Sequence, residues 1–199
     1  QFGREDAGRG DLTMSKAVLI SIRPKWCQKI VSGEKTVEIR KTRPRMATPF
    51  KCYIYCTMPK YPHEDFIATD YPKPQFYGGG KVVGEFTCDR IYELETRSPG
   101  GSYYVKGEGQ PTTNDVARQS CLSLGDMHAY LKSKSGYGLH ISDLKIYDTP
   151  KELIEFRRVC PNDLYCDSCA MHWENNGTCG NESLRLKRPP QSWCYVEEM

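Results

Sequence analysis

Three charged side chains follow a glycine at fixed spacing in Gly33-Glu34-Lys35-Thr36-Val37-Glu38-Ile39-Arg40, which reads Gly-x-Lys-x-x-Glu-x-Arg. Strand periodicity places Glu38 and Arg40 on the same face of one strand. A carboxylate in that position can orient a guanidinium and leave its planar set of donors for a phosphate or a base edge. The alternative is an exposed ion pair, which contributes about 0–1 kcal/mol and has no further role.

Basic residues are concentrated around this motif. Between Lys16 and Arg45 there are nine of them against Glu34 and Glu38, a local charge of +7, so the rest of the chain must sum to −4 to give the overall +3. Such asymmetry indicates a polyanionic partner such as nucleic acid, although a solvated face can show the same pattern. The residues expected to bind nucleic acid are Arg23, Lys25, Lys35, Glu38, Arg40, Lys41, Arg43 and Arg45.

A second set of candidate ligands lies in a cysteine-rich insertion at residues 160–180. Cys160, Cys166, Cys169 and Cys179 include one Cys-x-x-Cys pair, and His172 is a possible substitute for one thiolate. Four thiolates fit a tetrahedral structural Zn²⁺ site without an open position for water. The segment has few large apolar residues, so a metal would help it fold. The alternatives are an iron–sulfur cluster and four unliganded thiols.

The other six cysteines follow strand or helix patterns, in which a free thiol behaves as a small buried hydrophobe. His140 is expected to be a structural histidine within a strand. The sequence lacks the Gly-x-Ser-x-Gly elbow, the His-Glu-x-x-His zinc motif and the dinucleotide fingerprint. These absences exclude the familiar hydrolase and dehydrogenase classes.

The elements that must position these residues are short. Strands are predicted at 17–23, 35–41, 51–57, 81–94, 137–147 and 192–197 from their apolar, β-branched and alternating residues. Helices are predicted after Pro24, after the capping residue Ser123 and after Thr149-Pro150, with Gly33 ending the first. Irregular connections are expected at 58–80 and 96–113. This pattern favours an α+β fold, a small barrel of mixed strands with flanking short helices.

The chain of 199 residues is about one domain in size, and its 38% hydrophobic and 27% charged residues argue against disorder. Residues 1–13 are interpreted as a disordered extension or tag, and residues 14–199 as the domain. The longest apolar run, Ala17–Ile20, is far short of the roughly 18 residues of a membrane span. With no signal-like segment either, we expect a cytoplasmic protein with reduced thiols and no membrane partner.

The motif and its flanks resemble the ASCH domain family of the PUA-like superfamily, particularly members common in bacterial and phage genomes. The resemblance covers most of residues 16–197 and includes the segments 21–26, 84–86, 140–147 and 189–193 besides the motif itself. It implies a small PUA-like β-barrel flanked by helices, with a basic cleft near the motif. It also implies binding of RNA, another nucleic acid or a modified nucleotide.

Some small bacterial relatives are similar to amidohydrolases that deacetylate N4-acetylcytidine with a lysine, a threonine nucleophile and a distant glutamate. Lys35 matches that lysine, but Glu38 stands at the threonine position, and a carboxylate cannot perform the hydroxyl's role unchanged. We therefore predict a binding protein rather than an enzyme. The alternative is a hydrolase of a modified pyrimidine nucleoside with Lys35, Glu38 and Arg40 as its catalytic groups, and a third possibility is a protein-interaction module that docks through the cysteine-rich segment.

Overall fold

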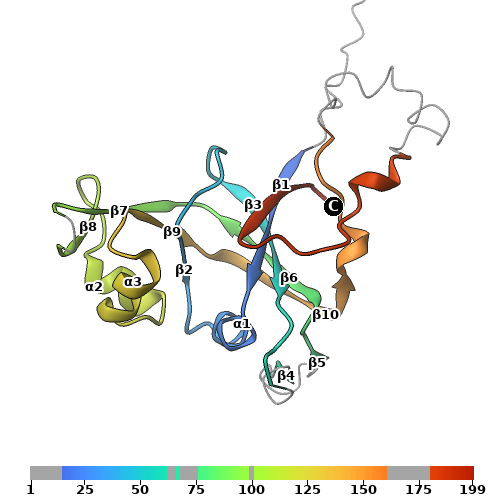
Figure 1. Cartoon of the computed structure of the whole chain (residues 1–199), viewed down its shortest axis with the longest axis horizontal. Helices are drawn as coiled ribbons and strands as arrows, with labels where there is room; N and C mark the ends of the chain where they lie inside the picture. Colours follow the sequence, from blue (N-terminus) through green and yellow to red (C-terminus); the bar gives the residue numbers. More distant parts are fainter. Residues whose placement is uncertain (1–14, 62–65, 68–75, 99–100, 161–179) are drawn as a thin grey trace, which may run out of the picture.

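The computed structural model of the chain describes residues 15–61, 66–67, 76–98, 101–160 and 180–199 (Figure 1). The extension predicted at residues 1–13 lies outside this part of the chain. The strands are β1 (Lys16–Ile22), β2 (Val37–Arg40), β3 (Phe50–Cys56), β4 (Phe66–Ile67), β5 (Phe76–Tyr77), β6 (Lys81–Cys88), β7 (Ile91–Thr96), β8 (Tyr103–Val105), β9 (Gly136–His140), β10 (Ser142–Glu152) and β11 (Trp193–Glu197). The helices are α1 (Pro24–Val31), α2 (Thr113–Gln119) and α3 (Leu124–Leu131), with 3-10 turns at Leu153–Glu155 and Glu182–Leu184.

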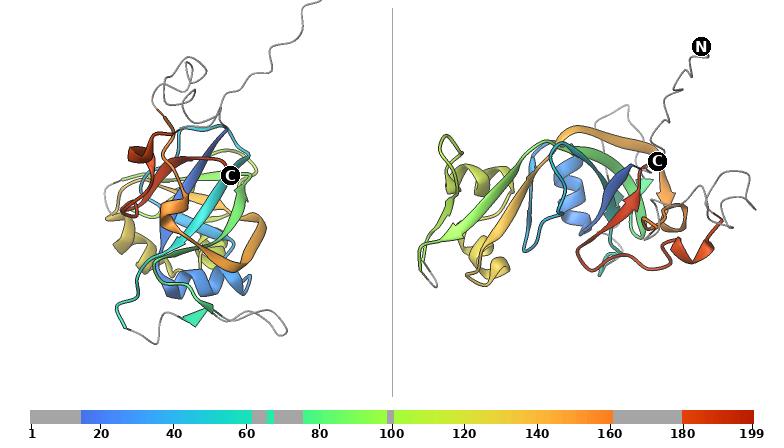
Figure 2. Two further views of the ribbon diagram at one scale, coloured as in Figure 1. Left: turned by 90° about the vertical axis from the view of Figure 1, so that its right-hand side faces the viewer. Right: turned by 90° about the horizontal axis from the view of Figure 1, so that it is seen from above.

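The strands form two main sheets. One has five strands in the order β10-β6-β3-β1-β11, the other has four in the order β2-β9-β7-β8, and β4 and β5 pair as a separate ribbon (Figures 1 and 2). The β1–β3 pair is parallel and the remaining pairs are antiparallel. The α+β class and the mixed strands are as predicted. The predicted small barrel is not found closed among the described residues, because the edge strands of the two sheets do not pair with one another.

The local signals around the motif act as predicted. Pro24 begins α1, where a missing N–H costs no helical hydrogen bond, and Gly33 follows the helix in the left-handed region with φ of +77°. Cys27 and Ile30 are buried on the inner side of the helix. The chain then enters β2 in a fixed orientation, since β2 pairs along its whole length with β9.

Several elements differ from the sequence predictions. The helix predicted after Thr149-Pro150 is wrong, because β10 continues to Glu152 through pairing of Lys151 and Glu152 with β6, and only a 3-10 turn follows. The strand predicted at 81–94 is divided into β6 and β7, which belong to different sheets. Strand β8 lies within the region expected to be irregular. Helix α2, which the sequence did not predict, begins at the end of that region with a capping box of Thr112 and Asp115.

The buried residues form three clusters. Successive residues of β3 point to opposite faces of the five-stranded sheet, so Cys52 and Ile54 pack toward α1 and β9 while Tyr53 packs against Phe156 on the other face. The third cluster lies between the four-stranded sheet and helices α2 and α3 and includes Met127. Helix α1 and helix α3 thus approach β2 from different clusters, which brings residues distant in sequence to one place.

A helix with the length and the apolar composition needed to cross a membrane does not occur among the described residues.

Candidate nucleic-acid site

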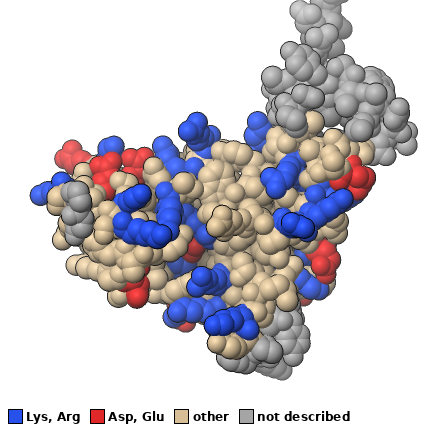
Figure 3. All heavy atoms as spheres, viewed as in Figure 1, with Lys and Arg blue, Asp and Glu red and all other residues tan. Residues whose placement is uncertain are grey.

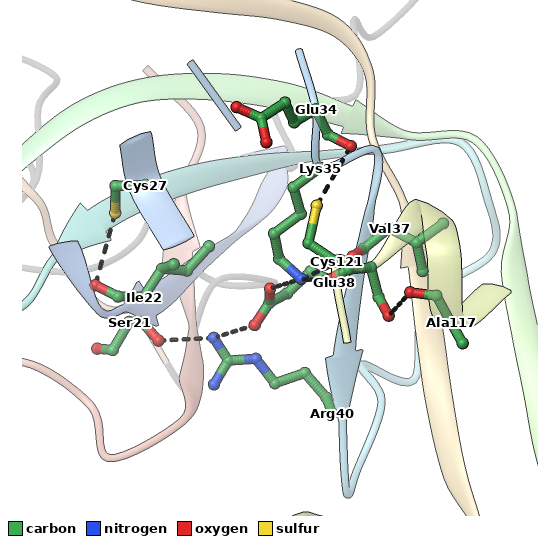
Figure 4. A network of polar contacts seen from close by, with 11 residues as sticks. Ser21, Ile22, Cys27, Glu34, Lys35, Val37, Glu38, Arg40, Ala117 and Cys121 are labelled. Atoms are coloured by element: carbon green, nitrogen blue, oxygen red, sulfur yellow. Dashed lines mark hydrogen bonds and ion pairs between the residues drawn. The ribbon is translucent and has the colours of Figure 1, made fainter. Parts of the chain in front are cut away.

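Strand β2 carries a buried network of charged side chains (Figure 4). Glu38 and Arg40 lie on one face of the strand, as predicted, and Lys35 joins them from the turn before it. Their exposed fractions are 6%, 7% and 3% respectively, so all three are out of bulk water. Glu38 Oε2 lies 3.1 Å from Lys35 Nζ, and Glu38 Oε1 lies 3.0 Å from an Arg40 terminal nitrogen. Two cations and one carboxylate leave a formal charge of +1 in the interior.

Lys35 is fully engaged by the protein. Besides the ion pair, its ammonium donates to the carbonyl oxygens of Val37 at 2.9 Å and Ser120 at 2.8 Å. An ammonium has three N–H donors, and these contacts account for all of them. The Ser120 carbonyl comes from the C-terminal end of α2, which the sequence did not connect to the motif. Lys35 therefore ties α2 to β2 and holds Glu38 in place.

Arg40 has unused hydrogen-bonding capacity. One terminal nitrogen donates to the Ser21 carbonyl at 2.6 Å and contacts Glu38, which fixes the guanidinium between β1 and β2. Its Nε is buried and has no hydrogen-bond partner among the described residues. Leaving such a donor unpaired costs about 1–3 kcal/mol. An acceptor supplied by a ligand or by water would remove that cost.

Tyr130 of α3 lies beside Arg40. Its side chain is 39% exposed, and Arg40 is within hydrogen-bonding reach of its hydroxyl. Burial raises the pKa of the Tyr130 phenol, while the neighbouring charge of Arg40 acts in the opposite direction. Lys41 Nζ lies 5.1 Å from the centre of the tyrosine ring. Tyr130 was expected only as part of a capped helix, and the available signal was that it is an aromatic residue outside the stripe formed by Met127 and Leu131.

Helix α1 supplies the other side of the arrangement. The ring of Trp26 lies 4.4 Å from Lys25 Nζ and 5.2 Å from Lys35 Nζ, both within the range of cation–π attraction. Hydrogen bonds from Ser123, aided by the charge of Lys25, lower the pKa of Asp126 in α3. We call the surface formed by Lys25, Trp26, Arg40, Lys41 and Tyr130 the α1–α3 site.

The remaining predicted basic residues are exposed but differ in their surroundings. Arg23 lies near Tyr130, and its positive charge acts to lower the pKa of the Tyr130 phenol. Arg43 contacts β7 and β9: its guanidinium lies 3.5 Å from the Glu93 carboxylate and 5.7 Å from the centre of the Tyr137 ring. Arg45 lies beside β11, where its backbone N–H donates to the Tyr195 hydroxyl. Figure 3 shows Lys and Arg side chains scattered over the central part of one face, with acidic atoms grouped toward its margins.

His140 takes part in a separate pair on the opposite face of the sheet from Glu38. Its Nδ1 lies 2.5 Å from Asp89 Oδ1. Partial burial would raise the pKa of Asp89, but the hydrogen bond and charge of His140 hold it below its ordinary value. The neighbouring thiol of Cys88 is buried, which raises its pKa to about 12 and makes it a poor nucleophile at neutral pH.

The predicted metal ligands fall mostly outside the described part of the chain. Cys166, Cys169, Cys179 and His172 belong to residues 161–179, which the structure does not describe, whereas Cys160 is described and half-buried. Within the described residues no group of three or more His, Cys, Asp and Glu side chains could hold a metal ion. The structural Zn²⁺ site therefore stays a prediction.

Comparison with known proteins identifies a fold. A tyrosine-to-phenylalanine mutant of the ASCH protein from Zymomonas mobilis shares 18% identity, with 92% of this chain and 91% of that chain covered and a TM-score of 0.50. The crystal structure of ASCH from Zymomonas mobilis also shares 18% identity over 92% of this chain and 88% of that one, with a TM-score of 0.46. No family profile matches the sequence, and no curated protein does.

At this level of identity the likeness concerns the fold alone. The chain has the fold of an ASCH protein, so the predicted likeness to ASCH proteins is confirmed at the level of the fold. Activity does not follow from fold, so the function must be argued from the site.

Proposed function

We propose that this protein binds nucleic acid at the α1–α3 site, with single-stranded RNA or a modified nucleotide as its ligand. The observation that carries the proposal is the buried Arg40 guanidinium, whose Nε has no partner among the described residues, beside the exposed Tyr130. Around it, Arg23, Lys25 and Lys41 are exposed and form no ion pair with any described residue. A donor, an aromatic face and free cations are the three contacts that an unpaired nucleotide requires.

The side chains divide these contacts among themselves. The exposed cations attract and position the phosphates, which is the salt-dependent and sequence-independent part of binding. Tyr130 stacks on a base, a contact of about 1–3 kcal/mol. Arg40 donates from the exposed part of its guanidinium to a base edge or a phosphate oxygen while Glu38 holds its orientation. Lys35, whose N–H donors are all engaged, holds Glu38 in place and does not contact the ligand.

Binding requires no hydrolytic step. Each Glu38 oxygen already faces a cation at about 3 Å, so the carboxylate serves as an anchor for Lys35 and Arg40. No particular contact among the described residues favours a nucleophile at this position. The proposal is accordingly restricted to recognition of the nucleotide.

The test is fluorescence anisotropy of labelled single-stranded RNA, single-stranded DNA and duplex DNA at a series of salt concentrations. Lys41→Ala should reduce the dependence of log K on log salt by about 0.7 on a single strand, as expected for one lost phosphate contact. Lys145→Ala is the matched control, because Lys145 is equally exposed but belongs to β10 of the other sheet.

Two further variants address the specific contacts. Arg40→Lys keeps a positive charge opposite Glu38 but removes the Nε donor and the planar fork, so it should weaken binding several-fold without unfolding the protein. Tyr130→Ala should weaken binding of single strands by about 1–3 kcal/mol and affect duplex DNA less. Wild-type affinity in both variants, or loss of affinity equal to that of Lys145→Ala, would refute the proposal.

A further inference from the structure

A second basic region lies directly after the C-terminal end of α3. Residues 96–98, at the end of β7, and residues 132–135, between α3 and β9, line a depression of about 580 Å³ that opens broadly to solvent. Strands β7 and β8 lie toward one end of the molecule (Figure 1), and the depression is lined from the end of β7. Nothing in the sequence motif points to it.

The lining has one kind of charge. Arg97, Lys132 and Lys134 contribute three cations, the other lining residues carry hydroxyl groups, and no acidic side chain takes part. None of these three cations forms an ion pair with a described residue; the Arg97 guanidinium instead lies 5.6 Å from the centre of the Tyr104 ring. Like charges gathered without counter-ions repel one another, and an anion seated among them would relieve the repulsion.

The backbone of this turn is held in an unfavourable conformation. Lys132 and Ser133 both have φ of +55°, in the left-handed region that residues with a Cβ rarely adopt. Two consecutive residues of this kind, neither of them glycine or asparagine, indicate a turn whose shape is enforced by its surroundings. Strained residues of this kind cluster at binding sites, where a fixed shape is useful.

Contacts with β8 and with the start of β9 fix the shape of the turn at residues 132–135. The hydroxyl of Tyr103, a buried residue of β8, donates to the Lys134 carbonyl at 2.8 Å, and its ring packs 4.5 Å from that of His128. On the other side, a Cβ at Gly136 would come within 2.5 Å of the Leu131 side chain, so the turn is pressed against the start of β9. Lys132 and Lys134 are therefore carried by a turn of fixed shape, which lowers the entropic cost of binding a ligand.

We propose that this depression, the β7–α3 site, binds a phosphate group of the nucleic-acid strand held at the α1–α3 site. The inference rests on the proposed function, since Lys132 follows Tyr130 by only two residues and one strand can reach both places. Two residues span at most about 7 Å, comparable to the distance covered by a few nucleotides. The three cations and four hydroxyls match the charge and the acceptor oxygens of a phosphate.

The first experiment measures binding of a labelled 12-nucleotide oligouridine RNA to the triple variant Arg97→Ala, Lys132→Ala, Lys134→Ala. A control variant removes the same charge elsewhere through Lys60→Ala, Lys145→Ala and Lys187→Ala, all exposed in the structure. The β7–α3 variant should bind about tenfold more weakly at low salt, with the slope of log K against log salt reduced by about 0.7 relative to the control, as expected for one lost phosphate contact. Equal behaviour of the two variants would overturn the inference.

The second experiment separates this inference from the proposed function. Amide resonances of the ¹⁵N-labelled protein are followed during titration with inorganic phosphate and, separately, with the RNA. Saturable shifts at residues 96–98 and 132–135 with phosphate support the β7–α3 site even where the RNA fails to bind, an outcome that would refute only the α1–α3 proposal. RNA binding with shifts confined to the α1–α3 site, and no response of the β7–α3 site to either probe, would refute the inference and leave the proposed function in place.

Discussion

Glu38 is the residue on which the buried network depends, and Glu38→Gln is the most informative substitution. The change keeps the shape of the side chain but removes the negative charge between Lys35 and Arg40, which are 3% and 7% exposed. At the observed separations of 3.1 and 3.0 Å, each attraction is about 5 kcal/mol for an effective dielectric constant of 20. Desolvation of the carboxylate offsets several kcal/mol of this sum. The expected loss of stability is about 3–5 kcal/mol, typical of a buried pair deprived of one partner.

The assay is equilibrium urea unfolding at neutral pH, with the m-value checked to show that both proteins unfold over the same surface. Glu34→Gln is the matched control, because Glu34 belongs to the same motif and contacts Lys29 at 2.7 Å, yet both groups are exposed. It should leave the urea midpoint unchanged within error. A loss below 1 kcal/mol for Glu38→Gln, or a loss equal to that of Glu34→Gln, would show that Glu38 is not the electrostatic anchor of Lys35 and Arg40.

Three other outcomes follow from the described contacts and from the sequence. Ser123→Ala removes the side-chain acceptor for the Asp126 N–H at the start of α3 and should cost about 1 kcal/mol in urea unfolding, whereas no loss would show that the capping box is dispensable. Asp89→Asn should destabilise the protein at neutral pH, because the pKa of Asp89 is lowered in the folded protein. The difference in stability from wild type should persist above about pH 4, the ordinary pKa range of aspartate, and shrink as the pH falls below it. A pH-independent difference would contradict this assignment. Native mass spectrometry should find one Zn²⁺ per chain, lost in Cys169→Ser and retained in Cys121→Ser, and a metal-free chain would refute the zinc prediction.

Much of the local structure could be predicted from the sequence, because its causes are local. Pro24 and Gly33 delimit α1 through fixed or permissive backbone angles, and Ser123 begins α3 through a hydrogen bond three residues away. The period of two along a strand is sufficient to place Glu38 and Arg40 on one face. Local rules failed where pairing with a distant strand prevailed, as when β6 kept Lys151 and Glu152 extended in place of the predicted helix.

The chemistry of the site was decided by tertiary structure. The sequence by itself determined that Lys35, Glu38 and Arg40 stand together on or beside one strand, and that cations surround them. It could not determine that Lys35 donates a hydrogen bond to the carbonyl of Ser120, 85 residues away. Nor could it determine that Arg40 donates to Ser21 and lies beside Tyr130. Residue type and spacing specify which hydrogen bonds and ion pairs a side chain is able to form. Burial, and the groups that α2, α3 and β1 place next to the side chain, determine which of these interactions are already formed within the protein. Only the folded chain distinguishes Lys35, whose N–H donors are all engaged by the protein, from Arg40, whose Nε has no partner among the described residues.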